Sequence, residues 1–201
     1  MQMEDLIQKG KERFPYLSEE QLIEFLGMGE LVSLAEGEIF SKAGNREERA
    51  AFVLQGLLRN YIITDDGDEV TVVFATEMQG LAPYSSVFLN EPATETTEAV
   101  QPSLVLAMNV KTMREKAHKD VSYARVYTDI IEQALMAAIG RIEDFTKRSP
   151  EQRYQALLDR HGYLIEQVPL KYLASYIGVN AVSLSRIRKR VATAHKRPKQ
   201  A

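Results

Sequence analysis

The stretch YLASYIGVNAVSLSRIRKR, residues 172–190, decides the fold of the C-terminal part of the chain. A helix-turn-helix needs a turn residue that tolerates positive φ, a small residue where the helices approach, and apolar residues between them. Gly178 and Ala174 meet the first two needs, and Asn180 is a good N-cap for the second helix. The apolar positions are Leu173, Ile177, Val179, Leu184 and Ile187. The stretch therefore predicts a helix-turn-helix, with a two-helix hairpin inside a bundle as the alternative.

A helical wheel of the second helix places basic and hydroxyl side chains opposite its buried side. The major groove of DNA admits an α-helix, arginine can pair with guanine, and an apolar side chain can contact a thymine methyl group. Arg186 projects from the middle of this face and is the predicted base reader, whereas Lys189 and Arg190 are expected to contact phosphates. The predicted DNA-binding residues are Asn180, Val182, Ser183, Ser185, Arg186, Lys189 and Arg190.

The charge of the chain is unevenly distributed. Residues 149–201 contain 10 Lys and Arg against 3 Asp and Glu, a net charge of +7, whereas residues 1–148 have a net charge of −10. A basic end on an acidic protein indicates a polyanion as the partner of that end. The alternative is a solvated basic tail, but residues 195–201 hold only three of the ten basic residues.

The residues before this region divide into three segments with different periodicity. Residues 1 to about 30 are expected to be helical, and Ser18 with Gln21 has the spacing of a capping box. Short runs of β-branched, aromatic and leucine residues from about 31 to 108 predict antiparallel strands, with a hairpin turn at Asp66-Gly67. Residues 120–148 predict one long helix, and Ser149-Pro150 predicts the start of the next domain.

The long helix has an apolar stripe that needs a partner. Its members are Tyr123, Val126, Tyr127, Ile130, Ile131, Ala134, Leu135, Ala138, Ile139, Ile142 and Phe145. The stripe can pack on the protein's own strands or on the same helix of a second copy, and some packing of each kind is expected. Small residues would permit close approach of helices, and they are Ala134, Ala137, Ala138 and Gly140.

This order of segments resembles the Crp/Fnr family of bacterial transcription regulators. The stretches LAEGEIFSKAG and AAFVLQGLLRNYIITDDGDEVTVVF resemble the family's cyclic-nucleotide-binding-like β-roll, and residues 148–190 resemble its winged DNA-binding domain. The resemblance implies an α+β fold: a β-roll of jelly-roll type with N-terminal helices in residues 1–119, a dimerisation helix in residues 120–148, and a helix-turn-helix domain in residues 149–201. Only VATAHKRPKQA follows the second helix of the motif, so the family's β-wing is expected to be short or absent.

The resemblance also indicates that the nucleotide pocket is degenerate. Family members that bind cyclic nucleotides use a glutamate for the ribose and an arginine for the phosphate. Leu81 and Ala93 stand at these positions, and residues 80–100 contain three glutamates and no Lys or Arg. Cyclic AMP and cyclic GMP are therefore not expected to bind in the usual way. Another small effector remains open, with candidate contacts at Tyr84, Ser85, Ser86, Thr94, Tyr123 and Tyr127, and so does the alternative that these residues surround no ligand.

Composition narrows the remaining function classes. The chain has no cysteine, so no iron–sulfur cluster of the sensing branch is expected, and residues 31–108 contain no histidine for a metalloenzyme barrel. No apolar run approaches the length of a membrane span, and the prediction is a cytoplasmic protein without a membrane partner, metal or enzymatic activity. The expected partners are double-stranded DNA, a second copy of the chain and, as a further candidate, RNA polymerase. The alternative function is a ligand sensor that acts through protein contacts without specific DNA binding.

Overall fold

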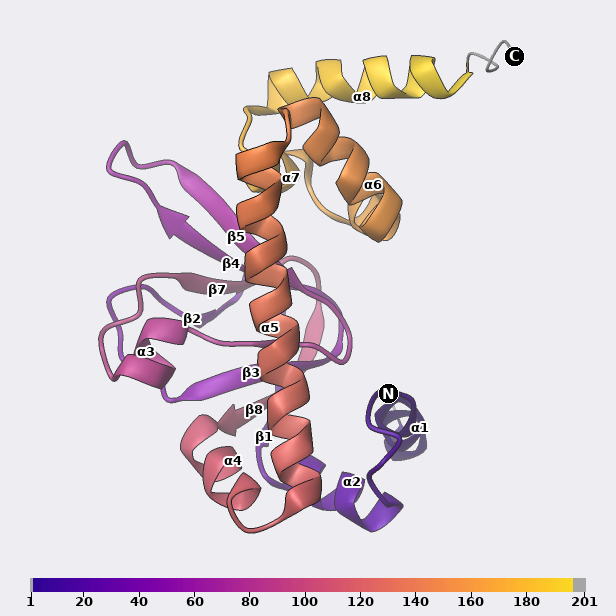
Figure 1. The fold of residues 1–201 in the computed structure, drawn as a ribbon. Coiled ribbons are helices and arrows are strands. Elements are labelled where there is room, and N and C mark those ends of the chain that lie inside the picture. Colours follow the sequence, from indigo (N-terminus) through magenta and orange to yellow (C-terminus); the bar gives the residue numbers. More distant parts are fainter. Residues whose placement is uncertain (1, 197–201) are drawn as a thin grey trace. The chain divides into compact units, whose positions relative to one another are not determined.

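The computed structural model describes residues 2–196 and divides the chain into two compact units (Figure 1). Unit 1 comprises Met1–Ile62 and Val73–Leu135, and unit 2 comprises Ile63–Val72 and Met136–Ala201. This division differs from the segments expected at residues 120 and 149, because it falls inside a single helix. Helix α5, Val121–Lys147, is continuous, and its two halves belong to different units.

Unit 1 begins with two helices that pack on the sheets. Helix α1 spans Met3–Arg13 and helix α2 spans Glu19–Gly27. The predicted capping box is confirmed, because Ser18 accepts a hydrogen bond from the backbone N–H of Gln21 and the Gln21 side chain accepts one from Ser18. Phe14 contacts Phe25 and Phe52 with ring centroids 5.9 and 6.0 Å apart, which joins this helical pair to the strands.

In the described residues, eight strands form two four-stranded sheets, which confirms the prediction of short antiparallel strands. The strands are β1 Glu30–Leu34, β2 Ile39–Ser41, β3 Arg49–Gln55, β4 Leu58–Ile63, β5 Glu69–Ala75, β6 Gly80–Leu81, β7 Thr96–Ala99 and β8 Ser103–Asn109. The strand orders are β1-β8-β3-β6 and β2-β7-β4-β5. The hairpin predicted at Asp66-Gly67 joins β4 to β5, and Gly67 has the positive φ, 84°, that the tight turn requires.

The two faces of the first sheet belong to two hydrophobic cores. Residues that point toward the second sheet form an inner core that includes Ala51, Val53 and Val105. Residues at alternating positions, such as Phe52, point instead toward the helices and form the second core. The helices on that side include α4, Val110–Ala117, and the first half of α5, in which Tyr123 is fully buried. A short helix that the sequence did not predict, α3 at Tyr84–Leu89, interrupts the strands between β6 and β7.

Unit 2 contains the helices that follow α5. They are α6 Pro150–Gln167, α7 Leu170–Ile177 and α8 Ala181–Lys196. The predicted cap of α6 is confirmed, because Ser149 accepts a hydrogen bond from the N–H of Gln152 and Pro150 occupies the first turn. Helix α8 continues through residue 196, so the stretch where a β-wing would begin is helical as far as the structure describes it. The last residues, 197–201, lie outside the described part of the chain.

Candidate nucleic-acid interface and effector cavity

The turn between α7 and α8 requires a glycine for two reasons. Gly178 ends α7 in the left-handed conformation, with φ 73° and ψ 42°. A Cβ atom at this position would lie 2.7 Å from Cε1 of Phe145, which is well inside van der Waals contact. The N–H of Val179 donates to the carbonyl of Ala174 at 2.9 Å and closes the turn. The sequence identified the conformational reason, whereas the contact with Phe145 depends on how α5 packs within unit 2.

Helix α8 begins at the residue that the sequence predicts. The Asn180 side chain accepts a hydrogen bond from the N–H of Ser183 at 2.8 Å, as an N-cap does. One side of α8 is buried against α6 and α7. The buried side chains of the three helices are Tyr154, Leu157, Leu164, Ile165, Leu173, Ala174, Ile177, Leu184, Ile187 and Val191. This small core fixes which face of α8 points outward.

The outward face of α8 carries the predicted DNA-binding residues. Val182 is 63% exposed, and Arg186, Lys189 and Arg190 are exposed as well. The exposed Asn180 begins this row, while Ser183 and Ser185 are half-buried beside it. Arg188, which the sequence reading left out of the set, is also exposed. Helix α8 therefore exposes four cations, of which Arg186, Lys189 and Arg190 lie on the outward face, and their roles in DNA contact stay predictions.

One of these cations has a protein partner. Arg190 forms an ion pair with Glu151 of α6 at 2.9 Å, with both side chains about half exposed. Exposed pairs of this kind are weak, typically below about 1 kcal/mol, so a phosphate can compete with Glu151 for the guanidinium group. The sequence reading did not detect this pair, because Glu151 lies 39 positions earlier in the chain.

Two arginines hold the end of α7 within unit 2. Arg141 donates to the carbonyl of Tyr176 at 2.8 Å, and Arg153 donates to the carbonyl of Ile177 at 2.8 Å. These carbonyls belong to the last turn of a helix and have no partner inside it. Both guanidinium groups also lie over the ring of Phe145, at 4.8 and 4.4 Å from its centre. Burial lowers the pKa of Arg141, although an arginine side chain stays charged.

The hairpin between β4 and β5 contacts the same helix end. Arg141 donates a second hydrogen bond to the carbonyl of Thr71 at 2.9 Å, and the N–H of Thr71 donates to Oγ of Ser175 at 3.1 Å. Thr71 is fully buried. Strand β5 of this hairpin is therefore part of the framework that supports the helix-turn-helix, and the contact could not be predicted because Thr71 lies 70 positions before Arg141 and 104 before Ser175.

In unit 1, a carboxylate occupies the N-terminus of α3. The N–H of Tyr84 donates to Oε1 of Glu95 at 2.5 Å, and Oγ1 of Thr94 donates to Oε2 at 2.6 Å. Glu95 is 7% exposed. Burial of the Tyr84 phenol raises its pKa, and the nearby charge of Glu95 raises it further. A negative group is favourable where helix N–H groups point outward. This carboxylate lies in the segment where the family's phosphate cassette was expected.

Three of the predicted ligand residues hold this segment together instead of pointing into a cavity. Oγ of Ser85 accepts from the N–H of Thr94 at 3.1 Å, and Oγ of Ser86 accepts from the N–H of Glu47 at 2.7 Å. Tyr123 lies apart from them, because its ring is buried against α2 and its hydroxyl lies 2.8 Å from the carbonyl of Gln21.

A buried ion pair connects β4 and β7. Arg59 is 1% exposed, and its Nε and Nη2 atoms lie 2.9 and 2.5 Å from Oε2 of Glu98. The two residues are direct partners in the strand register. Glu98 is one of the three glutamates in residues 80–100, a stretch without Lys or Arg, and its cation comes from a strand 39 positions earlier in the chain. The Arg59 guanidinium group therefore forms a buried ion pair with the Glu98 carboxylate.

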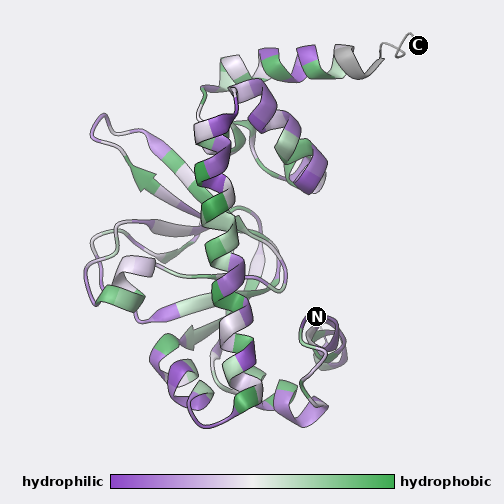
Figure 2. Ribbon diagram, viewed as in Figure 1, coloured by the Kyte–Doolittle hydropathy of each residue, from purple (hydrophilic) through white to green (hydrophobic). Residues whose placement is uncertain are grey.

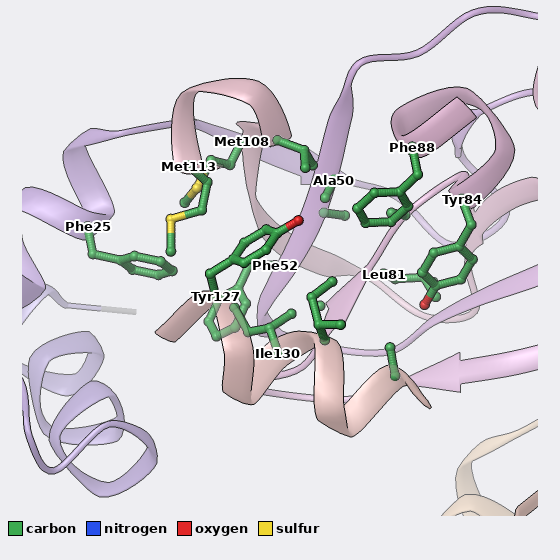
Figure 3. Close-up of a pocket in the computed structure, with 16 residues that line it drawn as sticks. Phe25, Ala50, Phe52, Leu81, Tyr84, Phe88, Met108, Met113, Tyr127 and Ile130 are labelled. Atoms are coloured by element: carbon green, nitrogen blue, oxygen red, sulfur yellow. The ribbon is translucent and has the colours of Figure 1, made fainter. Parts of the chain in front are cut away.

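The other two predicted ligand residues, Tyr84 and Tyr127, line an apolar cavity of about 70 Å³, here named the α5 cavity (Figure 3). Strands β3, β6 and β8 and helices α2, α3, α4 and α5 surround it. Its wall consists of Phe25, Ala50, Ala51, Phe52, Gly80, Leu81, Ala82, Tyr84, Phe88, Met108, Val110, Met113, Tyr127, Ile130, Ile131 and Ala134. Sequence reasoning missed most of this wall, because its members are apolar and carry no motif.

Known proteins share this architecture. Residues 31–120 match the family model of the cyclic nucleotide-binding domain. FixK2 from Bradyrhizobium japonicum aligns with a TM-score of 0.71 at 17% identity, over 83% of this chain and 86% of that one. The chain has the Crp/Fnr fold. A putative regulator of the Crp/Fnr family from Eubacterium rectale aligns with a TM-score of 0.67 at 16% identity, over 91% of this chain and 88% of that one.

One further solved structure is similar, and one search finds no match. The c-di-GMP-responsive global regulator CLP from Xanthomonas campestris shares the Crp/Fnr fold with a TM-score of 0.67 at 10% identity, over 89% of this chain and 93% of that one. A search of curated protein sequences finds no match. The fold predicted from the sequence is thus confirmed.

Within the described residues, no helix is long and apolar enough to cross a membrane, and no group of three potential metal ligands occurs.

Proposed function

We propose that this protein is a homodimeric transcription regulator of the Crp/Fnr type that binds double-stranded DNA through α8. The observation that carries the proposal is the outward face of α8, on which Arg186, Lys189 and Arg190 are exposed after a capped helix start, with Arg188 exposed beside them. Cations on one side of a helix neutralise phosphates, and the side chains near the helix start can reach base edges. The basic charge lies in an otherwise acidic chain, which favours a local role for it.

The dimer part of the proposal rests on the second half of α5. Its exposed apolar side chains are Leu135, Met136, Ile139, Ile142 and Phe145. Gly140 lies among them with open space at its Cβ position, so a second helix can approach closely there. Hydrophobic and hydrophilic residues alternate along the ribbon of α5 (Figure 2). A second copy of α5 would cover this surface with an equally apolar one, as in a parallel helix pair.

The same proposal includes a pocket that does not bind cyclic AMP or cyclic GMP in the usual way. The Glu95 carboxylate already accepts the hydrogen bond from the N-terminus of α3, and a phosphate brought next to it would meet like charge. Leu81 and Ala93 are buried at the positions where the family has its glutamate and arginine. Calorimetric titration with either nucleotide should show no binding. A dissociation constant in the micromolar range would contradict this part.

DNA binding is tested by selecting bound sequences from random duplexes and by a shift assay with the DNA upstream of the protein's own gene. A dimer with two α8 helices should select a nearly palindromic site, with half-sites one helical turn, about 34 Å, apart. The sensor function without DNA contact predicts that no sequence is enriched. Enrichment of a site without internal symmetry would contradict the dimeric mode of binding but not DNA binding itself.

A further inference from the structure

We propose that Glu151 is an internal competitor of DNA phosphate, which occupies Arg190 in the free protein and limits how tightly α8 binds any DNA. The proposal rests on the proposed function, because it concerns the same DNA-facing helix. Both residues belong to unit 2, and their ion pair at 2.9 Å joins the first turn of α6 to the outward face of α8.

Acidic residues are scarce in this domain, and one of them lies against the DNA-facing helix. Residues 149–201 contain three carboxylates, at Glu151, Asp159 and Glu166, against ten Lys and Arg. Asp159 accepts a hydrogen bond from the side chain of Gln155, and Glu166 lies exposed in the last turn of α6. Within the described residues, Glu151 is the one carboxylate of the three that forms an ion pair with a cation of α8.

The backbone holds both partners of this pair in place. The capping hydrogen bond between Ser149 and Gln152 fixes the start of α6, and a carboxylate is favourable in the first turn that follows. Arg190 precedes Val191, which is 6% exposed in the core that α6, α7 and α8 share. The side chains of Arg190 and Glu151 are 61% and 47% exposed, so a competing anion can reach the guanidinium group.

A DNA phosphate and the Glu151 carboxylate compete for the same donors. Both are anions whose oxygens accept hydrogen bonds from the fork of an arginine guanidinium group. In the part of the chain that the structure describes, the other three exposed cations of α8 form no ion pair, so Arg190 alone must exchange a partner when DNA binds. Non-specific binding depends almost wholly on phosphate contacts. The competition therefore weakens binding to every sequence by the same factor and leaves base reading unchanged.

The size of the effect follows from the strength of an exposed ion pair. Such a pair contributes up to about a fivefold factor in an equilibrium constant, and a dimer carries two of them. Removal of the carboxylate should therefore tighten DNA binding by roughly 3- to 25-fold. It should also steepen the salt dependence, by about 1 in the slope of log K against log salt for each α8 that gains a phosphate contact.

The test measures binding of the full-length protein to a random duplex and to a selected site by fluorescence anisotropy, at several salt concentrations. Glu151→Gln removes the carboxylate and should tighten binding to both DNAs by the same factor, and Glu151→Ala should do the same. Glu166→Gln is the matched control, because it makes the same change in charge at the other end of the same helix. It lies roughly 20 Å along α6, beyond the screening length of about 8 Å, and should change the affinity less than about twofold.

A second background separates competition for Arg190 from a general effect of charge. In Arg190→Ala the carboxylate has no guanidinium group to hold, so adding Glu151→Gln should change binding less than about twofold. Equal tightening in both backgrounds, or equal tightening by Glu166→Gln, would overturn the proposal. An unchanged DNA affinity of Glu151→Gln would overturn it as well, and a lowered melting temperature would then identify a pair that only joins α6 to α8. Absence of DNA binding by the wild type and by every variant would overturn the proposed function and this proposal together.

Discussion

Replacing Gly178 by alanine tests whether the turn of the helix-turn-helix is fixed as the structure indicates. A non-glycine residue in the left-handed conformation costs about 1 kcal/mol or more. The added Cβ would lie 2.7 Å from the Phe145 ring, and overpacking of this kind costs about 1–3 kcal/mol. Together the two effects predict a destabilisation of unit 2 by about 2–4 kcal/mol. For a domain of this size, that corresponds to a decrease in melting temperature of about 10 °C or more.

The assay is thermal unfolding followed by circular dichroism, with Gly162→Ala as the matched control. Gly162 lies in α6 with no atom within 4 Å of its Cβ position, so alanine there should be neutral or slightly stabilising. In a Phe145→Ala background the steric part disappears, and Gly178→Ala should then cost only about 1 kcal/mol. Equal melting temperatures for wild type and Gly178→Ala would refute the reasoning. An unchanged cost in the Phe145→Ala background would refute the contact.

Three further predictions concern other parts of the chain. Ile139→Glu should convert the dimer to monomers in sedimentation at micromolar concentration, whereas Thr128→Glu, exposed on α5 outside the stripe, should not. Arg59→Leu should lower the stability of unit 1 by roughly 3–5 kcal/mol, because it leaves Glu98 buried without this cation, and urea unfolding measures it. Partial desolvation and the charge of Arg160 lower the pKa of the exposed His161, so the folded state takes up this proton less readily than the unfolded chain. Unit 2 should therefore lose some stability as the pH falls from 7 to 5, and His161→Gln should flatten this dependence in thermal unfolding.

The features that could be predicted from the sequence are those that depend on near neighbours. The caps at Ser18, Ser149 and Asn180 and the turn at Gly67 each follow from residues a few positions apart. The long helix and the helix-turn-helix follow from the spacing of apolar residues, which is set by the helical period. The short helix α3 is not predicted from the sequence, because YSSVFL contains aromatic and β-branched residues that are common in strands, and Pro83 at its N-cap position accepts no capping hydrogen bond.

The features that could not be predicted depend on residues far apart in the chain. Arg59 meets Glu98 only through the pairing of β4 with β7, and Arg141 meets Thr71 across 70 positions. The Glu95 carboxylate was recognised as an acid in the cassette, but its contact with the start of α3 depends on a helix that was not expected. The α5 cavity combines residues from seven elements, and apolar residues in a wall have the same sequence pattern as apolar residues in a filled core.

The central claim is that α8 reads DNA, and binding of three proteins to two DNAs across salt concentrations tests it most directly. The proteins are wild type, Arg186→Ala and Lys189→Ala, and the DNAs are a selected site and a random duplex. Arg186→Ala should weaken the selected site by about 1–3 kcal/mol and leave the random duplex nearly unchanged. Lys189→Ala should weaken both equally and reduce the salt slope by about 1. Equal weakening of both DNAs by Arg186→Ala would contradict base reading by this residue, and no binding of wild type to either DNA would contradict the account as a whole.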